Sequence, residues 1–166
     1  MGKKCISIVV PMYNEQESLQ ILYWELNRVT REMGDYDFEY LFVNDGSKDA
    51  TLQKIRELAA EDERVHYLSF SRNFGKEAAL LAGLSYAKGD YVTTMDADLQ
   101  DDVDAMDRMI GAYEAGNDIV YGVRSSRQKD TFFKRNTAQF FYRMLHFLGA
   151  EIVYNHADYR LLSRRA

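Results

Sequence analysis

Short runs of β-branched and apolar residues alternate along this chain with segments whose apolar residues recur every three or four positions. The first pattern predicts buried strands and the second predicts amphipathic helices. The predicted strands are 6–10, 38–44, 65–71, 91–95 and 119–123, and the predicted helices are 18–32, 49–61, 76–87 and 103–115. This alternation with short connections predicts a single α/β domain, in which a predominantly parallel central sheet carries helices on both faces. Asp49, and Asp101 with Asp102, are expected to cap the helices that they precede.

Composition places the chain among ordinary soluble domains, with 166 residues, 46% hydrophobic and 28% charged. The single cysteine, Cys5, has no intramolecular disulfide partner, which favours a reducing compartment. No signal peptide is visible after Met1, and no apolar run reaches the roughly 18 residues of a membrane-spanning helix. We therefore expect this fragment to be soluble and cytoplasmic.

The net charge of −5 is unevenly distributed, because acidic residues outnumber basic ones in 1–123 and the reverse holds in 124–166. A metal-binding part beside an anion-binding part is one interpretation, and a solvated basic tail is the other. The basic residues lack the clustering that nucleic-acid recognition needs, so no nucleic-acid partner is predicted.

Polar segments follow each of the five predicted strands, at 11–15, 44–49, 71–76, 96–102 and 121–124. Ligands of parallel sheets bind outside the carboxyl ends of the strands, so these segments predict one binding cleft. A dinucleotide-binding fold is excluded, because the turn after the first strand contains no glycine.

Within this rim, Asp96 and Asp98 stand one residue apart after the fourth predicted strand, and Gln100 follows. Two carboxylates at this spacing on a strand exit point the same way, and oxygen ligands suit Mg²⁺ or Mn²⁺. For the tripeptide alone, a solvated acidic loop is the alternative. Its place among four other polar segments favours a metal site.

Several motifs, in order along nearly the whole chain, resemble family 2 glycosyltransferases, which have the GT-A fold. They are residues 9–15, 43–51 and 95–98. Further motifs resemble the polyprenyl-phosphate branch of that family, which includes dolichol-phosphate mannose synthase and the bacterial undecaprenyl-phosphate glucosyltransferases. These are residues 70–79, 98–101, 121–124 and 157–164.

The resemblance implies an enzyme that moves a hexose from a nucleotide-sugar to a polyprenyl phosphate, with inversion and with Mg²⁺ or Mn²⁺. UDP-glucose and undecaprenyl phosphate are the favoured pair. It implies Asp98 and Gln100 as the closest metal ligands, with Asp96 near the ribose or bridging to the metal. A family 2 enzyme acting on a saccharide hydroxyl and a non-catalytic nucleotide-binding module stay open as alternatives, and a homo-oligomer is compatible with the sequence.

For the donor, Pro11, Tyr13 and Glu15 are predicted to form one wall, with Glu15 accepting from ribose hydroxyls. Tyr13 fits core packing equally well. Asp45 ends a strand, where its carboxylate is predicted to accept an N–H of the base. Lys76 begins a helix, where a cation and backbone N–H groups together favour an anion, although a solvated lysine fits nearly as well.

For the acceptor, a lipid monophosphate is already largely dianionic, since its second pKa is about 6, and it needs cationic docking more than a general base. The available cations are Arg124, Arg127, Lys134, Arg135 and Arg160. Asp158 is expected to contact a sugar hydroxyl or to hold Arg160, and catalytic roles are assigned to Asp98, Arg124, Asp158 and Arg160.

Residues 131–148 place aromatic and basic side chains at helical spacing, which favours a helix at a membrane surface; packing on the sheet or on a second subunit fits nearly as well. Members of the branch continue beyond the motif that ends this chain. We therefore interpret 1–166 as a truncated GT-A catalytic domain whose full-length form acts at the cytoplasmic face of a membrane.

Overall fold

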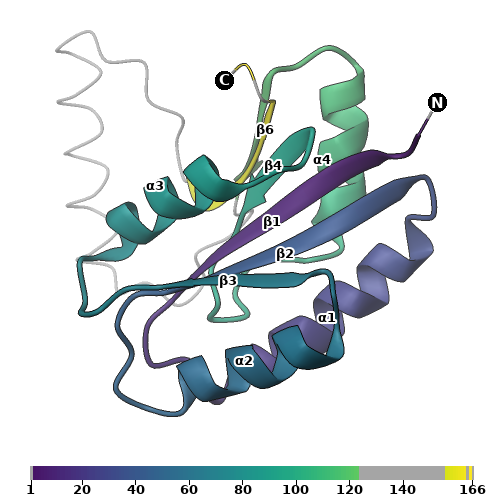
Figure 1. The fold of residues 1–166 in the computed structure, drawn as a ribbon. Helices are drawn as coiled ribbons and strands as arrows, with labels where there is room; N and C mark the ends of the chain where they lie inside the picture. Colours follow the sequence, from purple (N-terminus) through teal and green to yellow (C-terminus); the bar gives the residue numbers. More distant parts are fainter. Residues whose placement is uncertain (1, 124–155, 164, 166) are drawn as a thin grey trace, which may run out of the picture.

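The structure, a computed structural model, describes residues 2–123, 156–163 and 165 (Figure 1). The five strands and four helices predicted within residues 6–123 are all present, with their bounds moved by a few residues at most. The helices are α1 (Leu19–Glu32), α2 (Thr51–Glu61), α3 (Lys76–Tyr86) and α4 (Ala105–Glu114). The strands are β1 (Lys4–Met12), β2 (Tyr36–Asn44), β3 (Val65–Ser69), β4 (Tyr91–Thr94), β5 (Ile119–Val123) and β6 (His156–Ser163).

The described strands form one six-stranded sheet in the order β3-β2-β1-β4-β6-β5. β1 pairs in parallel with β2 and β4, and β2 pairs in parallel with β3. β6 is antiparallel to both of its neighbours, β4 and β5, and it is the one strand that the sequence pattern did not predict. The predicted, predominantly parallel sheet is therefore confirmed, with one antiparallel strand inserted between β4 and β5.

The alternation of side chains along β1 divides the core into two layers. Ile6, Ile8 and Val10 are fully buried against the residues of α1, α2 and α4, whereas Val9 belongs to a second cluster with Ala79 of α3. Successive strand residues point to opposite faces, so one strand supplies both layers. Helices thus cover both faces of the sheet, as predicted.

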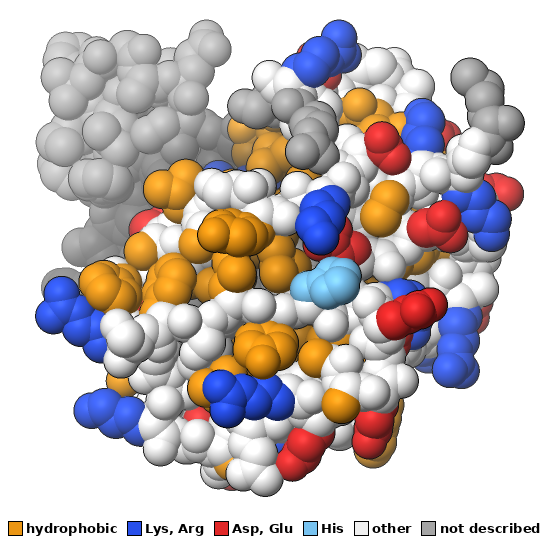
Figure 2. All heavy atoms as spheres, viewed as in Figure 1, with side chains coloured by type: hydrophobic (Ala, Val, Ile, Leu, Met, Phe, Trp, Pro, Cys, Tyr) orange, Lys and Arg blue, Asp and Glu red, His pale blue; other side chains and the backbone are white. Residues whose placement is uncertain are grey.

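The buried face of α3 consists of small residues, Ala79 and Gly83, which lets the helix backbone pack closely on the sheet. A Cβ added to Gly83 would stand 2.3 Å from Cγ1 of Val9, so only glycine fits there. The outer face of the same helix exposes two large apolar side chains: the exposed fractions of Leu81 and Tyr86 are 68% and 64%. Figure 2 shows hydrophobic side chains gathered over this part of the surface.

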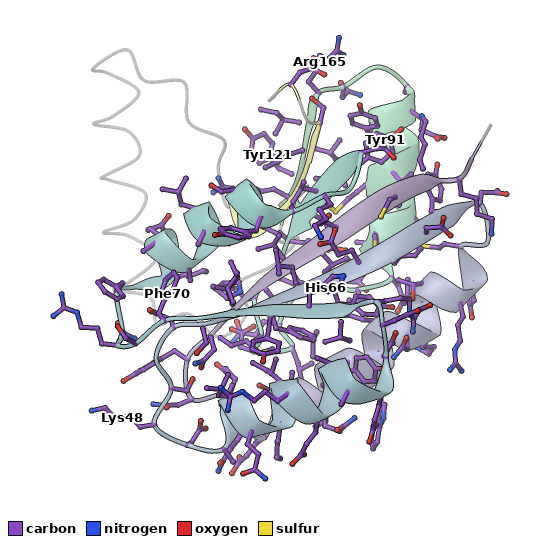
Figure 3. The ribbon with its side chains drawn as sticks, viewed as in Figure 1. Lys48, His66, Phe70, Tyr91, Tyr121 and Arg165 are labelled. Carbon is purple, nitrogen blue, oxygen red and sulfur yellow. The ribbon has the colours of Figure 1, made fainter. Side chains whose placement is uncertain are left out.

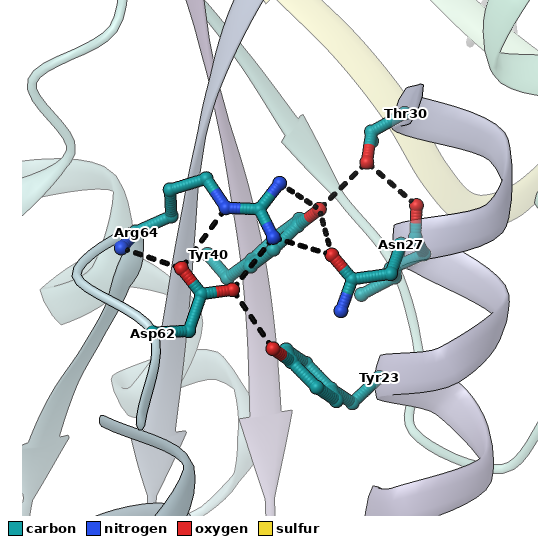
Figure 4. Close-up of polar contacts among 7 residues, drawn as sticks. Tyr23, Asn27, Thr30, Tyr40, Asp62 and Arg64 are labelled. Atoms are coloured by element: carbon teal, nitrogen blue, oxygen red, sulfur yellow. Dashed lines mark hydrogen bonds and ion pairs between the residues drawn. The ribbon is translucent and has the colours of Figure 1, made fainter. Parts of the chain in front are cut away.

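A polar network joins α1, β2 and the turn before β3 at the far edge of the sheet (Figure 4). The Arg64 guanidinium lies 2.6 Å from Oδ2 of Asp62 and also donates to Asn27 Oδ1. Tyr23 donates its hydroxyl hydrogen to the same carboxylate at 2.8 Å. Hydrogen bonding from Arg64 lowers the pKa of Asp62 to about 2. These contacts hold elements together and lie apart from the cleft described next.

Within the part of the chain that the structure describes, no helix has the length and apolar character needed to cross a bilayer.

Candidate functional site

A cleft of about 410 Å³ opens at the carboxyl ends of β1, β2 and β4, beside the first residues of α3. The segments that follow β1, β2, β3 and β4 contribute to it, as predicted, whereas residues 121–123 at the end of β5 are not part of its lining. Its lining consists of Pro11, Met12, Tyr13, Glu15, Asp45, Asn73, Gly75, Lys76, Asp96, Ala97 and Asp98.

The loop after β1 is tied to the loop after β2. Asn14, whose φ of 57° lies in the left-handed region that asparagine tolerates, donates its N–H to Ser47 Oγ at 3.0 Å. Its side-chain oxygen accepts the N–H of Lys48 at 2.8 Å. The Lys48 side chain itself points outward from this loop (Figure 3). Reciprocal bonds of this kind fix the two loops relative to each other, which makes the cleft wall preformed.

Pro11, Tyr13 and Glu15 lie on this wall, where they were predicted. Tyr13 is 41% exposed, so it is not a core residue. Glu15 donates its N–H to Thr51 Oγ1 at 2.8 Å, and its carboxylate accepts the hydroxyl hydrogen of Ser18. The ribose-binding role of Glu15 stays a prediction.

Asp45 is buried, with 3% of its surface exposed, and its carboxylate holds the loop between β3 and α3. One oxygen accepts the N–H of Phe74 at 2.7 Å and the other accepts the N–H of Gly75 at 2.9 Å. The neighbouring Gly46 has a φ of 66°, and a Cβ there would stand 2.3 Å from the carbonyl carbon of Arg72. This positioning role of Asp45 was not predicted from the sequence, and its predicted contact with a base stays a prediction.

Asp96 and Lys76 meet inside the cleft. The ammonium nitrogen of Lys76 lies 2.6 Å from Oδ1 of Asp96. The Asp96 backbone N–H in turn donates to Oδ2 of Asp101 at 3.2 Å. Asp101 therefore supports the acidic loop, whereas it was expected to cap the next helix, which begins only at Ala105.

The backbone between Asp98 and Gln100 turns through an uncommon conformation. Leu99 has a φ of 60°, which is rare for a branched, non-glycine residue and costs roughly 1–2 kcal/mol. Oδ1 of Asp98 accepts the N–H of Gln100 at 3.0 Å. The structure thus places Asp98 in the cleft, while Gln100 is exposed and lies outside the cleft lining.

The acidic residues of the cleft could hold a divalent cation only together with ligands from a substrate. Among the described residues, no group of three or more His, Cys, Asp or Glu side chains could hold a metal ion. Mg²⁺, however, is commonly bound through one or two carboxylates together with substrate phosphates. Asp96 and Asp98 supply two such carboxylates to the lining of the cleft.

Two more predicted residues lie on β6, whose first residues reach the same rim. Arg160 pairs in register with Thr94 of β4 and with Tyr121 of β5. Its guanidinium carbon lies 5.9 Å from the centre of the Tyr121 ring. Tyr121 is labelled in Figure 3. Asp158 is two residues nearer the rim on the same strand. Arg124, Arg127, Lys134 and Arg135, with the rest of the predicted interfacial helix, lie outside the described residues.

Asp49 bonds to the first residue of α2, as a capping residue would, but the N-cap position itself is Ala50, one residue later than predicted. Asp49 accepts hydrogen bonds from the Thr51 backbone and hydroxyl and from the Gln16 N–H. Burial alone would raise the pKa of Asp49, but these hydrogen bonds outweigh it, and the pKa is lowered from its ordinary value. The ionised Asp49 carboxylate therefore stabilises the folded arrangement of the two loops.

A family model for glycosyl transferase family 2 matches residues 7–166. The bactoprenol glucosyl transferase of Shigella phage SfX is 46% identical over 160 residues, which are 96% of this chain and 52% of that protein. A prophage bactoprenol glucosyl transferase homolog of Escherichia coli K12 is 45% identical over the same shares. The chain belongs to glycosyl transferase family 2, as the sequence motifs predicted, and it spans about half the length of these curated relatives.

Solved structures agree on the fold. A mannosyltransferase of Pyrobaculum calidifontis, in complex with GDP-Man and Mn²⁺, superposes with a TM-score of 0.68 at 19% identity over 99% of this chain and 46% of that one. Glucosyl-3-phosphoglycerate synthase of Mycobacterium tuberculosis, in complex with Mn²⁺, UDP and phosphoglyceric acid, gives 0.66 at 20% identity over 98% and 56%. The predicted GT-A fold is confirmed.

Proposed function

We propose that this chain is the catalytic domain of a metal-dependent hexosyltransferase that moves a sugar from a nucleotide donor to a polyprenyl phosphate. The observation that carries the proposal is the pair of carboxylates, Asp96 and Asp98, in a cleft at the carboxyl ends of the parallel strands. Relatives about 45% identical are named bactoprenol glucosyl transferases, which supports glucose and an undecaprenyl acceptor. UDP-glucose is the favoured donor.

The cleft supplies the groups that a nucleotide-sugar needs. Tyr13 and Glu15 form a wall for the nucleoside, and Glu15 would accept hydrogen bonds from the ribose hydroxyls. Asp45 also lines the cleft. Asp96 and Asp98 would hold Mg²⁺ or Mn²⁺ on the diphosphate. When bound, the ion would neutralise the charge that develops on the leaving diphosphate.

The acceptor side follows from the chemistry of a phosphate monoester. Its oxygen is anionic at neutral pH, so the protein needs no strong base to activate it. Direct attack on the anomeric carbon forms one C–O bond as the bond to the diphosphate breaks, which inverts the configuration. Arg160, near the rim, and Arg124 are the cations proposed to dock the phosphate. Because the lipid acceptor stays in a bilayer, the full-length protein would act at its cytoplasmic surface.

The direct test is incubation with radiolabelled UDP-glucose, undecaprenyl phosphate and Mn²⁺. The proposal predicts label in a product that is extracted into organic solvent and released by mild acid. Label that enters only water-soluble saccharide would show a hydroxyl acceptor and refute the lipid acceptor. Failure to turn over any UDP-sugar, despite nucleotide binding, would point to a non-catalytic module.

The division into donor and acceptor halves has its own test. Arg124→Ala is expected to raise the KM for the lipid phosphate while the affinity for UDP changes less than twofold, because Arg124 is assigned to the acceptor alone. Lys129→Ala, in the same basic segment, is the matched control. Equal losses of UDP binding and lipid-phosphate use in Arg124→Ala would contradict the division.

A further inference from the structure

The ion pair between Lys76 and Asp96 occupies the point in the cleft where a divalent cation is proposed to bind. The two charged atoms are 2.6 Å apart, and the side chains are 38% and 22% exposed. Lys76 is the first residue of α3, whereas Asp96 follows β4. The contact therefore joins two loops of the rim and is not a local pair within one helix.

The backbone that presents Lys76 is fixed from beneath. Asp45 accepts the N–H groups of Phe74 and Gly75, the two residues directly before Lys76. Asp45 is buried and stands at the end of β2, next to β1. The loop that carries the Lys76 ammonium group into the cleft is thus held in place, and within the cleft that group pairs with Asp96.

We propose that Lys76 is an internal counter-ion, which competes with a divalent cation for Asp96 and transfers to the diphosphate when the nucleotide binds. The inference rests on the proposed function, because it takes Asp96 to be part of the metal site. An ammonium group and a divalent cation repel each other at one carboxylate oxygen, so the free protein binds the cation weakly. A bound diphosphate offers the displaced ammonium a new anionic partner.

The consequence is thermodynamic coupling between cation and nucleotide. If the nucleotide removes Lys76 from Asp96, it strengthens cation binding, and by reciprocity the cation strengthens nucleotide binding by the same factor. Such coupling would keep the Asp96 carboxylate neutralised before the donor arrives and would make the donor and the ion bind together.

The experiment measures Mn²⁺ affinity by electron paramagnetic resonance, with and without UDP, in the wild type and three variants. Lys76→Met removes the charge but keeps an unbranched side chain. Without UDP, this variant is expected to bind Mn²⁺ about tenfold more tightly than wild type. A neighbouring positive charge changes the affinity of a carboxylate for a proton by about tenfold or more, and we expect a similar effect on Mn²⁺. The enhancement of Mn²⁺ affinity by UDP should shrink by a similar factor.

Two controls separate this role from general electrostatics. Lys76→Arg keeps the charge and is expected to restore weak Mn²⁺ binding in the absence of UDP. Lys88→Met removes an exposed charge beyond the other end of α3 and is expected to match wild type. A tightening in Lys88→Met equal to that in Lys76→Met would show a net-charge effect and overturn the proposal.

The same measurements distinguish failure of the counter-ion role from failure of the metal site. If wild type binds Mn²⁺ with UDP but Lys76→Met binds Mn²⁺ alone no more tightly than wild type, the counter-ion role is wrong and the metal site stands. If every variant fails to bind Mn²⁺ with or without UDP, the metal site itself is wrong and the counter-ion role falls with it.

Discussion

Replacing Asp45 with asparagine tests whether this buried carboxylate holds the loop that leads into α3. The wild-type side chain accepts two backbone hydrogen bonds, from Phe74 at 2.7 Å and from Gly75 at 2.9 Å. Asparagine keeps one acceptor oxygen but turns an NH₂ group toward the other N–H. A hydrogen bond to a charged group contributes about 1.5–3 kcal/mol, and a buried donor left unsatisfied adds to the loss, so Asp45→Asn should lower the free energy of unfolding by about 2–4 kcal/mol.

Urea unfolding measures that loss, and amide hydrogen exchange shows where it arises. Exchange at Phe74 and Gly75 should accelerate more than exchange in the core strands, because local opening no longer breaks two hydrogen bonds. Asp90→Asn is the matched control, since Asp90 also accepts a backbone N–H, that of Cys5 at 2.9 Å, but at an exposed position. A stability change in Asp45→Asn no larger than in Asp90→Asn, with unaltered exchange in the loop, would refute the role.

Two further predictions concern parts of the fold away from the cleft. Gly83→Ala should lower the free energy of unfolding in urea by about 1–3 kcal/mol, since its Cβ would meet Val9 at 2.3 Å. Gly111→Ala, which has open space around it, is the control and should be neutral or stabilising. Equal effects of the two substitutions would contradict the close packing of α3. Asp62→Asn should destabilise above pH 4. Because the folded pKa of Asp62 is about 2 and its ordinary value is 3.8, the stabilisation is complete above the ordinary value and is lost as pH falls toward 2. The melting temperatures of wild type and Asp62→Asn should therefore converge at low pH. A difference in melting temperature that stays constant with pH would show that the contact with Arg64 is not the source of the stabilisation.

Periodicity was sufficient to predict most of the fold because nearly every buried element carries a clear repeat. β1 alternates between two cores, and α1 buries Leu19, Leu22 and Leu26 at helical spacing. β6 was missed because its alternation of buried and partly buried residues, such as Tyr159 and Arg160, is short and was interpreted only as a motif. Its partners, β4 and β5, are distant in the sequence, so only the folded chain shows where it inserts.

The site was predictable in its location but not in its internal contacts. Strand ends placed Glu15 and Asp98 on one rim, since the carboxyl ends of parallel strands share an edge. Which polar groups pair with each other depends on loop conformation, and loop conformation has no periodicity. The bond from Asp96 to Asp101, and the capture of the loop before α3 by Asp45, are contacts of this kind.

The central claim is that Asp98 binds a divalent cation that carries the nucleotide, and calorimetric titration of UDP in the presence of Mn²⁺ tests it most directly. Wild type and Asp107→Asn, which removes an exposed carboxylate on α4, should bind UDP in a manner that requires Mn²⁺. Asp98→Asn should lose that binding while its thermal unfolding stays within a few degrees of wild type. UDP binding by Asp98→Asn that equals wild type and still depends on Mn²⁺ would contradict the claim.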